Sequence, residues 1–275
     1  IIRIGRMAGQ YGKPRSNPTE SVNDQEMLTY RGDAVNDFQA NPKSREPDPQ
    51  RLLQAYHHSA ITLNYIRAII SGGFADLHYP YNWNLHAIEN SPLWPEYQAW
   101  LDRILDAINF MESVGAAKEE TLGNIDFYVS HEGLLLEYEE ALTRKDPDSG
   151  HYYNIGAHTL WIGERTRALD SAHIEYFRGV QNPLGIKVGP KTDPKELVEL
   201  TKILNPNNAK GRLTLVTRMG AQNIEEALPP LIRAIQKEQR QVIWSCDPMH
   251  GNMKSTSQKQ KTRDFDDILS EIQQS

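Results

Sequence analysis

The fold is decided by the stretch from Gly185 to Gly220, which reads GIKVGPKTDPKELVELTKILNPNNAKGRLTLVTRMG. Its apolar runs at 185–188 and 213–217 predict two strands, and the segment 193–204 between them predicts a helix. A strand, a helix and a second strand in this order indicate a parallel β-α-β unit. Both strands are followed by glycine-containing turns.

Strand–helix pairs of the same kind surround this stretch. Three β-branched residues, Ile1, Ile2 and Ile4, predict a strand that Gly5 ends. Six strands that alternate with helices indicate an α/β fold with a parallel sheet. The other predicted strands lie at 125–129, 159–162 and 241–246, and the other helices at 133–143, 166–178, 223–237 and 263–273.

Two architectures contain such units, the (β/α)8 TIM barrel and the open doubly wound sheet. The strand ends of a barrel converge on one mouth, where catalytic residues lie. An open sheet more often carries a glycine-rich nucleotide turn, which this sequence lacks. The sequence therefore favours the barrel, and residues 1–275 are expected to form one incomplete barrel domain with six of its eight strands. One β-α unit before Ile1 and one after Ser275 would complete it.

The segment between the first predicted strand and the strand at 125–129 does not follow the alternation of strands and helices. Residues 17–50 are polar and contain four prolines, which predicts a long irregular connection. Apolar residues at helical spacing then predict long helices at 50–70 and 91–114, the second capped by Ser91. We expect a helical insertion at 50–114, after the first strand present, that forms a hairpin or a surface for a partner.

Charge and cysteine content restrict the partners and the compartment. The formal net charge of -6 and the pI near 5.9 argue against a general binder of nucleic acid or anionic membranes. Cys246 is the only cysteine, so an intrachain disulfide is excluded and a reducing cytoplasm is expected. No apolar run reaches the length of a transmembrane helix, and no signal peptide is recognised.

The reactive side chains share one position relative to the predicted strands. They lie at or just after the carboxyl ends of strands and are Arg6, His131, Glu164, Arg165, Lys187, Arg218 and His250. Lys13, Arg15 and Ser16 join them from the opening loop. Pro14 restricts the backbone of that loop. In a barrel all of these side chains would face one mouth.

Six cations at one mouth repel each other unless anions lie between them. Substrates with two phosphates and a carboxylate would account for the charge, and structural ion pairs with Glu132, Glu164 and Asp247 are the alternative. The position of His250 in the sequence does not decide its role, which could be that of a structural residue, an acid or base, or a metal ligand. No second His, Cys or carboxylate stands at convincing metal spacing, so a metal is not established by the residues alone.

Nine motifs taken together resemble the type II 3-deoxy-D-arabino-heptulosonate-7-phosphate (DAHP) synthases. They occur in order over nearly the whole chain and read GRMAGQYGKPRS, YRGDAVNDF, PDPQRLLQAYHHSA, GGFADLH, SHEGLLLEYEEALTR, AHTLWIGERTR, NPLGIKVGP, GRLTLVTRMG and CDPMHGN. This family condenses phosphoenolpyruvate with erythrose 4-phosphate in the first step of the shikimate pathway. The resemblance therefore implies a metal-dependent transferase of aromatic amino acid biosynthesis on a (β/α)8 barrel.

The resemblance also implies roles for individual residues. The phosphoenolpyruvate site would consist of Arg6, Trp161, Glu164, Arg165, Lys187 and Arg218. Lys13, Arg15 and Ser16 would hold erythrose 4-phosphate, and Lys13, Glu164, Lys187 and His250 would take part in catalysis. Glu164 and Lys187 are the candidates for activating the water that completes the reaction.

His250 would be a ligand of the divalent metal, expected to be Mn2+, with Co2+ or a similar ion as the alternative. The family's other ligands are a Cys, a Glu and an Asp whose motifs this sequence lacks. We therefore expect the chain to be inactive by itself and the full-length enzyme to be active. The resemblance further implies a homo-oligomer, and in some members aromatic amino acids are effectors at the helical insertion.

Two rival interpretations remain. A non-catalytic paralogue could keep the phosphate-binding residues and serve as a ligand-binding or interaction module. The octulosonate-phosphate version of the chemistry is a second option, although the segments GQYGKPRS and RGDAVNDF fit the heptulosonate enzyme better.

Overall fold

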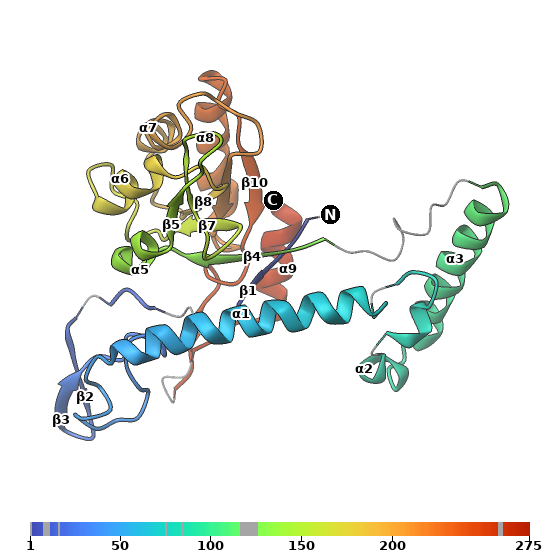
Figure 1. Cartoon of the computed structure of the whole chain (residues 1–275), viewed down its shortest axis with the longest axis horizontal. Coiled ribbons are helices and arrows are strands. Elements are labelled where there is room, and N and C mark those ends of the chain that lie inside the picture. Colours follow the sequence, from blue (N-terminus) through green and yellow to red (C-terminus); the bar gives the residue numbers. More distant parts are fainter. Residues whose placement is uncertain are drawn as a thin grey trace. The chain divides into compact units, whose positions relative to one another are not determined.

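A computed structural model describes residues 2–7, 12–15, 17–74, 76–83, 85–115, 126–257 and 261–275. The chain divides into two compact units (Figure 1). The first contains Ile1–Ala8 and His57–Tyr128, and the second contains Gly9–Tyr56 and Val129–Ser275. Each unit is described by itself.

The six predicted strands form one sheet in the order β1-β4-β7-β8-β9-β10. Neighbours from β4 to β10 pair in parallel, with Leu160 opposite Leu184 and Ile186 opposite Leu215. This confirms the parallel α/β sheet and is consistent with part of an α/β barrel, whereas closure into eight strands stays a prediction. The strands are β1 (Arg3–Arg6), β4 (Phe127–Glu132), β7 (Thr159–Ile162), β8 (Leu184–Val188), β9 (Leu213–Thr217) and β10 (Ile243–Cys246).

The two faces of this sheet differ in burial. Alternate residues such as Ile162, Ile186 and Leu215 are fully buried. Helices α6 (Ala172–Gly179), α7 (Pro194–Leu204) and α8 (Ile224–Lys237) lie beside the strands (Figure 1), and their own apolar residues are buried too. Because side chains alternate along a strand, Trp161 and Lys187 share the opposite, partly exposed face.

Capping side chains determine where the helices of this unit begin. Asp193 accepts a hydrogen bond from the backbone N–H of Glu196 at 2.9 Å and starts α7 within a residue of its predicted position. Helix α6 begins at Ala172 rather than at residue 166, because Ser171 caps it through the N–H of Ile174. The remaining helices here are α5 (Leu136–Ala141) and α9 (Phe265–Gln274).

The prediction that His131 follows a strand is wrong. Strand β4 runs to Glu132, so His131 lies inside it, paired with Leu160 on the helix-covered face. The imidazole is 1% exposed and its Nε2 lies 2.8 Å from Oε1 of Glu139 in α5. His131 is therefore part of the buried polar core and does not face the same side as Trp161.

Hairpins occupy segments that were predicted to be irregular. Strands β2 (Thr19–Val22) and β3 (Gln25–Leu28) pair within the 17–50 connection, and Asn23 and Asp24 form the turn with φ of 52° and 62°. Strands β5 (Thr143–Lys145) and β6 (Tyr152–Asn154) form a second hairpin around the turn after α5. A third antiparallel pair joins β11 (Lys254–Ser255) and β12 (Lys261–Thr262).

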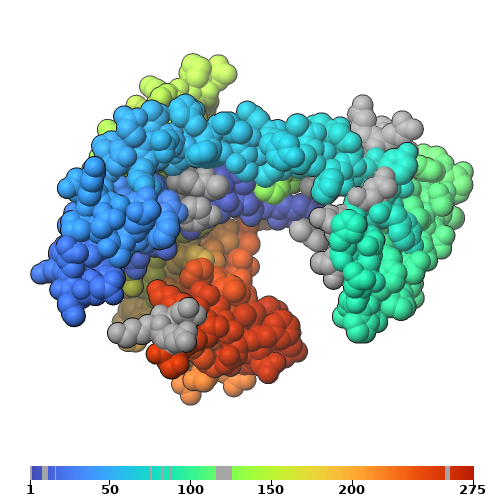
Figure 2. All heavy atoms as spheres, turned by 90° about the horizontal axis from the view of Figure 1, so that it is seen from below, coloured from blue at the N-terminus to red at the C-terminus, as the bar shows by residue number. Residues whose placement is uncertain are grey.

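Helix α1 (Pro49–Ser71) confirms the predicted helix at 50–70. It ends before Gly73, which has a φ of +83° that glycine adopts readily. Its apolar side chains do not all find a partner, since Ile61 and Tyr65 are both largely exposed. Figure 2 shows α1, in light blue, along the surface.

Helix α3 (Trp94–Ser113) begins later than predicted. Leu93 is its N-cap residue and a proline lies in its first turn, whereas Ser91 Oγ accepts a hydrogen bond from the Leu93 N–H, so the prediction of a Ser91 cap is wrong. The predicted hairpin with α1 stays a prediction. Two short elements precede α3, namely η1 (Pro80–Asn82), which packs against it, and α2 (His86–Glu89).

In the described part of the chain, no helix is both long enough and apolar enough to span a membrane.

Helix α9 holds two loops of the sheet through one buried carboxylate. Glu271 is fully buried. Its Oε1 accepts hydrogen bonds from the backbone N–H groups of Met219 and Gly220 at 2.8 and 2.9 Å. Its Oε2 accepts one from Nδ2 of Asn252 at 2.6 Å. The carboxylate therefore joins the loop after β9 to the loop after β10.

Replacing Glu271 by alanine should lower the free energy of unfolding by about 3 kcal/mol, because three buried donors lose their acceptor. Urea titration of the full-length protein measures this loss. Gln273→Ala, on the exposed side of the same helix, is the control and should be nearly neutral. A loss below about 1 kcal/mol for Glu271→Ala would contradict this role.

Candidate active site

Four strand ends bring one network of charged side chains together. Lys187 Nζ lies 2.5 Å from Oδ2 of Asp247, and Nδ1 of His250 lies 2.7 Å from the same oxygen. Arg218 donates from Nη1 to Oε2 of Glu164 at 2.8 Å and from Nη2 to the His250 carbonyl at 3.1 Å. The predicted site residues Glu164, Lys187, Arg218 and His250 are thus adjacent, as their positions at or just after the carboxyl ends of β7, β8, β9 and β10 suggested.

Asp247 is the centre of this network. Its side chain is 11% exposed, and its Oδ1 accepts from the backbone N–H groups of Met249 and His250. Burial alone would raise the pKa of this carboxyl, but the hydrogen bonds from His250 and Lys187 outweigh it and hold the pKa well below its usual value. Asp247 is therefore a fixed negative charge between two functional candidates.

The sequence predicted Asp247 only as a possible counter-charge, and it did not reveal that this carboxylate contacts both Lys187 and His250. Its place directly after β10, in the motif CDPMHGN, was the available signal.

A glycine provides the space for the Glu164 carboxylate. A Cβ atom on Gly189 would lie 2.0 Å from Oε1 of Glu164, which no side chain could tolerate. Because Gly189 follows β8 directly, the carboxylate can lie against the backbone there and meet Arg218.

The ion pairs account for only part of the positive charge. Lys187 and Arg218 are paired with carboxylates, as the structural alternative required. Lys13, Arg15 and Arg165 form no ion pair with any residue that the structure describes. Three cations of the predicted site therefore remain available to an anionic ligand.

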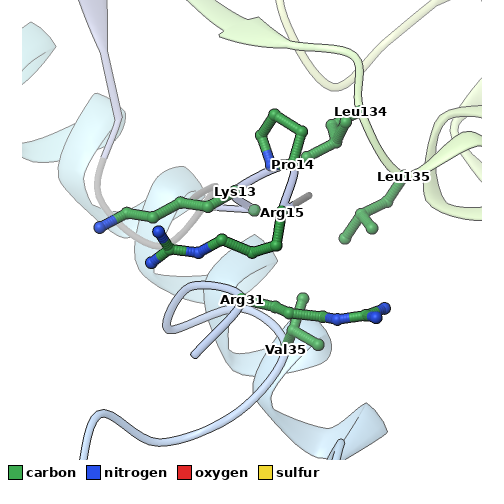
Figure 3. A pocket seen from close by; sticks show the side chains of 8 residues that line it. Lys13, Pro14, Arg15, Arg31, Val35, Leu134 and Leu135 are labelled. Atoms are coloured by element: carbon green, nitrogen blue, oxygen red, sulfur yellow. The ribbon is translucent and has the colours of Figure 1, made fainter. Parts of the chain in front are cut away.

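Arg165 connects these strand ends to the opening loop. Its Nη1 donates to the carbonyl oxygen of Pro14 at 2.8 Å. Figure 3 shows the side chains of Lys13 and Arg15 extending from the loop in the same direction, with both charged ends on one side. A cavity of about 250 Å³ adjoins the loop, and Leu134 and Leu135 contribute to its apolar lining.

For three further residues of the predicted site, the structure gives less information about their relation to this network. Arg6 ends β1 in the first unit, so its membership of the site stays a prediction. Ser16 lies outside the described residues. Trp161 lies on the same sheet face as Lys187, with Gly185 as its strand partner.

His250 suits a metal ion as a single ligand. Its Nδ1 is held by Asp247, and the side chain is 58% exposed, which leaves Nε2 accessible. A carboxylate on the second ring nitrogen is the usual partner of a metal-bound histidine. Within the described ranges, no group of three or more His, Cys, Asp or Glu side chains could hold an ion. The described residues thus fit one ligand of a metal site and not a complete set.

The fold is a parallel α/β sheet that is consistent with part of an α/β barrel, and charged side chains gather at the ends of its strands. Residues 1–275 match the model of the Class-II DAHP synthetase family, and the chain belongs to that family. This confirms the resemblance carried by the sequence motifs.

Curated relatives support the same assignment. The relatives from Neurospora crassa, Streptomyces coelicolor and Mycolicibacterium smegmatis are all called phospho-2-dehydro-3-deoxyheptonate aldolase. They are 48%, 45% and 42% identical to the chain over 290, 272 and 278 residues. These matches cover 100%, 99% and 99% of the chain, but only 60%, 60% and 59% of the relatives. The chain thus spans about 60% of the length of these relatives.

Proposed function

We propose that the full-length protein condenses phosphoenolpyruvate with erythrose 4-phosphate to DAHP and phosphate, the first step of the shikimate pathway. Family membership and the names of the curated relatives support this proposal. The observation that carries it is the shared carboxylate of Asp247, which holds Lys187 and His250 side by side. One cation and one imidazole at adjacent strand ends suit a phosphorylated substrate next to an aldehyde, which a metal held through the imidazole would polarise.

The cations would bind and orient the two substrates. Arg165, Lys187 and Arg218 would hold the phosphate and carboxylate of phosphoenolpyruvate, with Trp161 along its pocket. Lys13 and Arg15 would hold the phosphate of erythrose 4-phosphate, together with Ser16. Because Arg165 donates to Pro14 in the loop that carries Lys13 and Arg15, the two sites would be adjacent. Such positioning lowers the entropic barrier to a reaction between two substrates.

The reaction forms a C–C bond and exchanges the C2–O bond to phosphate for a C2–O bond to water. Attack of C3 of phosphoenolpyruvate on the aldehyde carbon turns the aldehyde oxygen into a hydroxyl and leaves an oxocarbenium-like C2. Water adds at C2, and cleavage of the C2–O bond to the phosphate group releases phosphate and leaves the ketone. The two protons of the water end on the new hydroxyl and on the released phosphate. Glu164 and Lys187 are the candidates for activating this water. A divalent metal held through His250 would supply Lewis-acid polarisation of the aldehyde.

Several expectations accompany this proposal. Mn2+ is the expected metal, the enzyme would be a cytoplasmic homo-oligomer, and aromatic amino acids would be effectors at the helical insertion. A single barrel domain with an insertion at 50–114 is part of the same proposal.

An assay of the full-length protein tests the function. Phosphate release and DAHP formation should require both substrates, stop in excess chelator and return on addition of Mn2+. A non-catalytic phosphate-binding paralogue is the alternative, favoured by the lack of a complete ligand set among the described residues. Binding of phosphoenolpyruvate without DAHP formation would establish that alternative, and activity unaffected by the chelator would contradict the metal.

A further inference from the structure

We propose that Tyr30 is a positioning residue that holds Lys13 and Arg15 toward one phosphate group. This inference rests on the proposed function, which identifies that phosphate as the one on erythrose 4-phosphate. Tyr30 opens the segment Tyr30-Arg31-Gly32-Asp33, which contributes none of the predicted site residues.

Hydrogen bonds hold both the side chain and the backbone of Tyr30. Its Oη donates to Oδ1 of Asp33 at 2.5 Å, and its backbone N–H donates to Oε1 of Glu20 at 3.2 Å. Burial and the hydrogen bond to Asp33 raise the pKa of the phenol to about 12, so it stays protonated at neutral pH. The ring therefore has a fixed place and a fixed charge distribution.

Two cations lie within reach of this ring. Lys13 Nζ is 5.1 Å from the ring centroid, and the Arg45 guanidinium carbon is 5.6 Å from it. Arg45 is itself buried and immobilised by Glu20 and by the carbonyl of Gln39. The ring thus packs against the immobilised guanidinium of Arg45 and attracts the ammonium of Lys13.

Backbone carbonyls hold the same loop. The carbonyl of Tyr30 accepts from Arg15 Nε at 2.7 Å, and that of Arg31 accepts from the Lys13 N–H at 2.7 Å. Because Nε of Arg15 is engaged, its two terminal nitrogens remain for a bidentate contact with phosphate oxygens. Buried Asn36 bonds the Arg31 N–H and the Thr29 carbonyl, which fixes the segment itself.

These contacts assign different parts of Tyr30 to different cations. The carbonyl that holds Arg15 survives any side-chain substitution at Tyr30, whereas the ring contact with Lys13 depends on an aromatic side chain. A substitution at Tyr30 should therefore act through Lys13. It should affect erythrose 4-phosphate and spare phosphoenolpyruvate.

The test compares Tyr30→Leu and Tyr30→Phe in the full-length protein. Tyr30→Leu should raise the KM for erythrose 4-phosphate about tenfold and leave the KM for phosphoenolpyruvate and kcat within about twofold. Tyr30→Phe keeps the ring and should stay within about twofold of the wild type in all three constants. Tyr65→Leu, at an exposed tyrosine of α1, controls for the loss of a surface ring.

A double-mutant cycle with Lys13→Ala separates positioning from a general structural role. If Tyr30 acts through Lys13, Tyr30→Leu should have no further effect on the erythrose 4-phosphate KM once Lys13 is alanine. A structural role would instead lower the melting temperature and raise both KM values in either background.

Three results would overturn the inference. They are an unchanged KM for erythrose 4-phosphate in Tyr30→Leu, an equal rise for both substrates, and a Tyr30→Phe variant as impaired as Tyr30→Leu. Each requires an active wild type and leaves the proposed function intact. A wild type that neither binds erythrose 4-phosphate nor forms DAHP would refute the proposed function and this inference together.

Discussion

Lys187→Ala is expected to abolish condensation in the full-length protein, with a loss of about 10³-fold or more in kcat/KM. Lys187 is held by Asp247 beside His250 and lies on the partly exposed face of the sheet. Its ammonium would neutralise phosphoenolpyruvate where the new bond forms. Arg218 would not replace it, because its guanidinium is held by Glu164.

The fold should survive this substitution. The core side chains of β8, Ile186 and Val188, point to the other face and are fully buried. Asp247 would keep His250 and two backbone N–H groups as partners. Lys191→Ala, at an exposed lysine just after β8, is the matched control and should retain activity. Lys187→Ala activity within about tenfold of the wild type, with normal circular dichroism, would show that the site is misplaced.

The second large effect is expected for Asp247→Asn. Asparagine keeps the size of the side chain but removes the charge that attracts Lys187 and orients His250. Loss of such an outer partner typically reduces metal affinity or activity by about 10- to 100-fold. We expect kcat to fall by that factor and the Mn2+ concentration needed for half-maximal rate to rise.

The matched control is Asp266→Asn, at an exposed position in the first turn of α9. Titration of Mn2+ binding to the full-length protein gives a readout that does not depend on turnover. If Asp247→Asn left both the metal affinity and kcat unchanged, the proposed role of Asp247 in positioning Lys187 and His250 would be contradicted.

The repeating pattern of the sequence predicts the part of the site that depends on strand ends. Strands at 159–162 and 213–217 have the predicted bounds, so Glu164 and Arg218 could be placed at the same edge of the sheet from the sequence alone. This succeeds because parallel strands deliver the residues after them to one edge.

His131 shows where that reasoning fails. A strand boundary displaced by two or three residues put it after β4, whereas it lies within the strand. Because side chains alternate along a strand, the true register places it on the helix-covered face. Apolar periodicity alone could not resolve that boundary.

Contacts between segments that lie far apart in the chain could not be predicted from the sequence either. The single carboxylate of Asp247 meets Lys187 across 60 residues, and the ring of Tyr30 meets Lys13 from the loop between β3 and α1. Nothing local in either segment indicates its partner. The Asn23-Asp24 turn is different, since a dipeptide of this kind between two short runs does indicate a hairpin and could have been recognised.

In the proposed reaction, the ends of β7 to β10 form one site for anions next to His250. A crystal structure of the full-length protein with phosphoenolpyruvate tests it most directly. We expect phosphate and carboxylate oxygens within hydrogen-bonding distance of Lys187, Arg218 and Arg165. Phosphoenolpyruvate bound elsewhere, with the Lys187–Asp247 and Arg218–Glu164 pairs untouched by ligand, would contradict it.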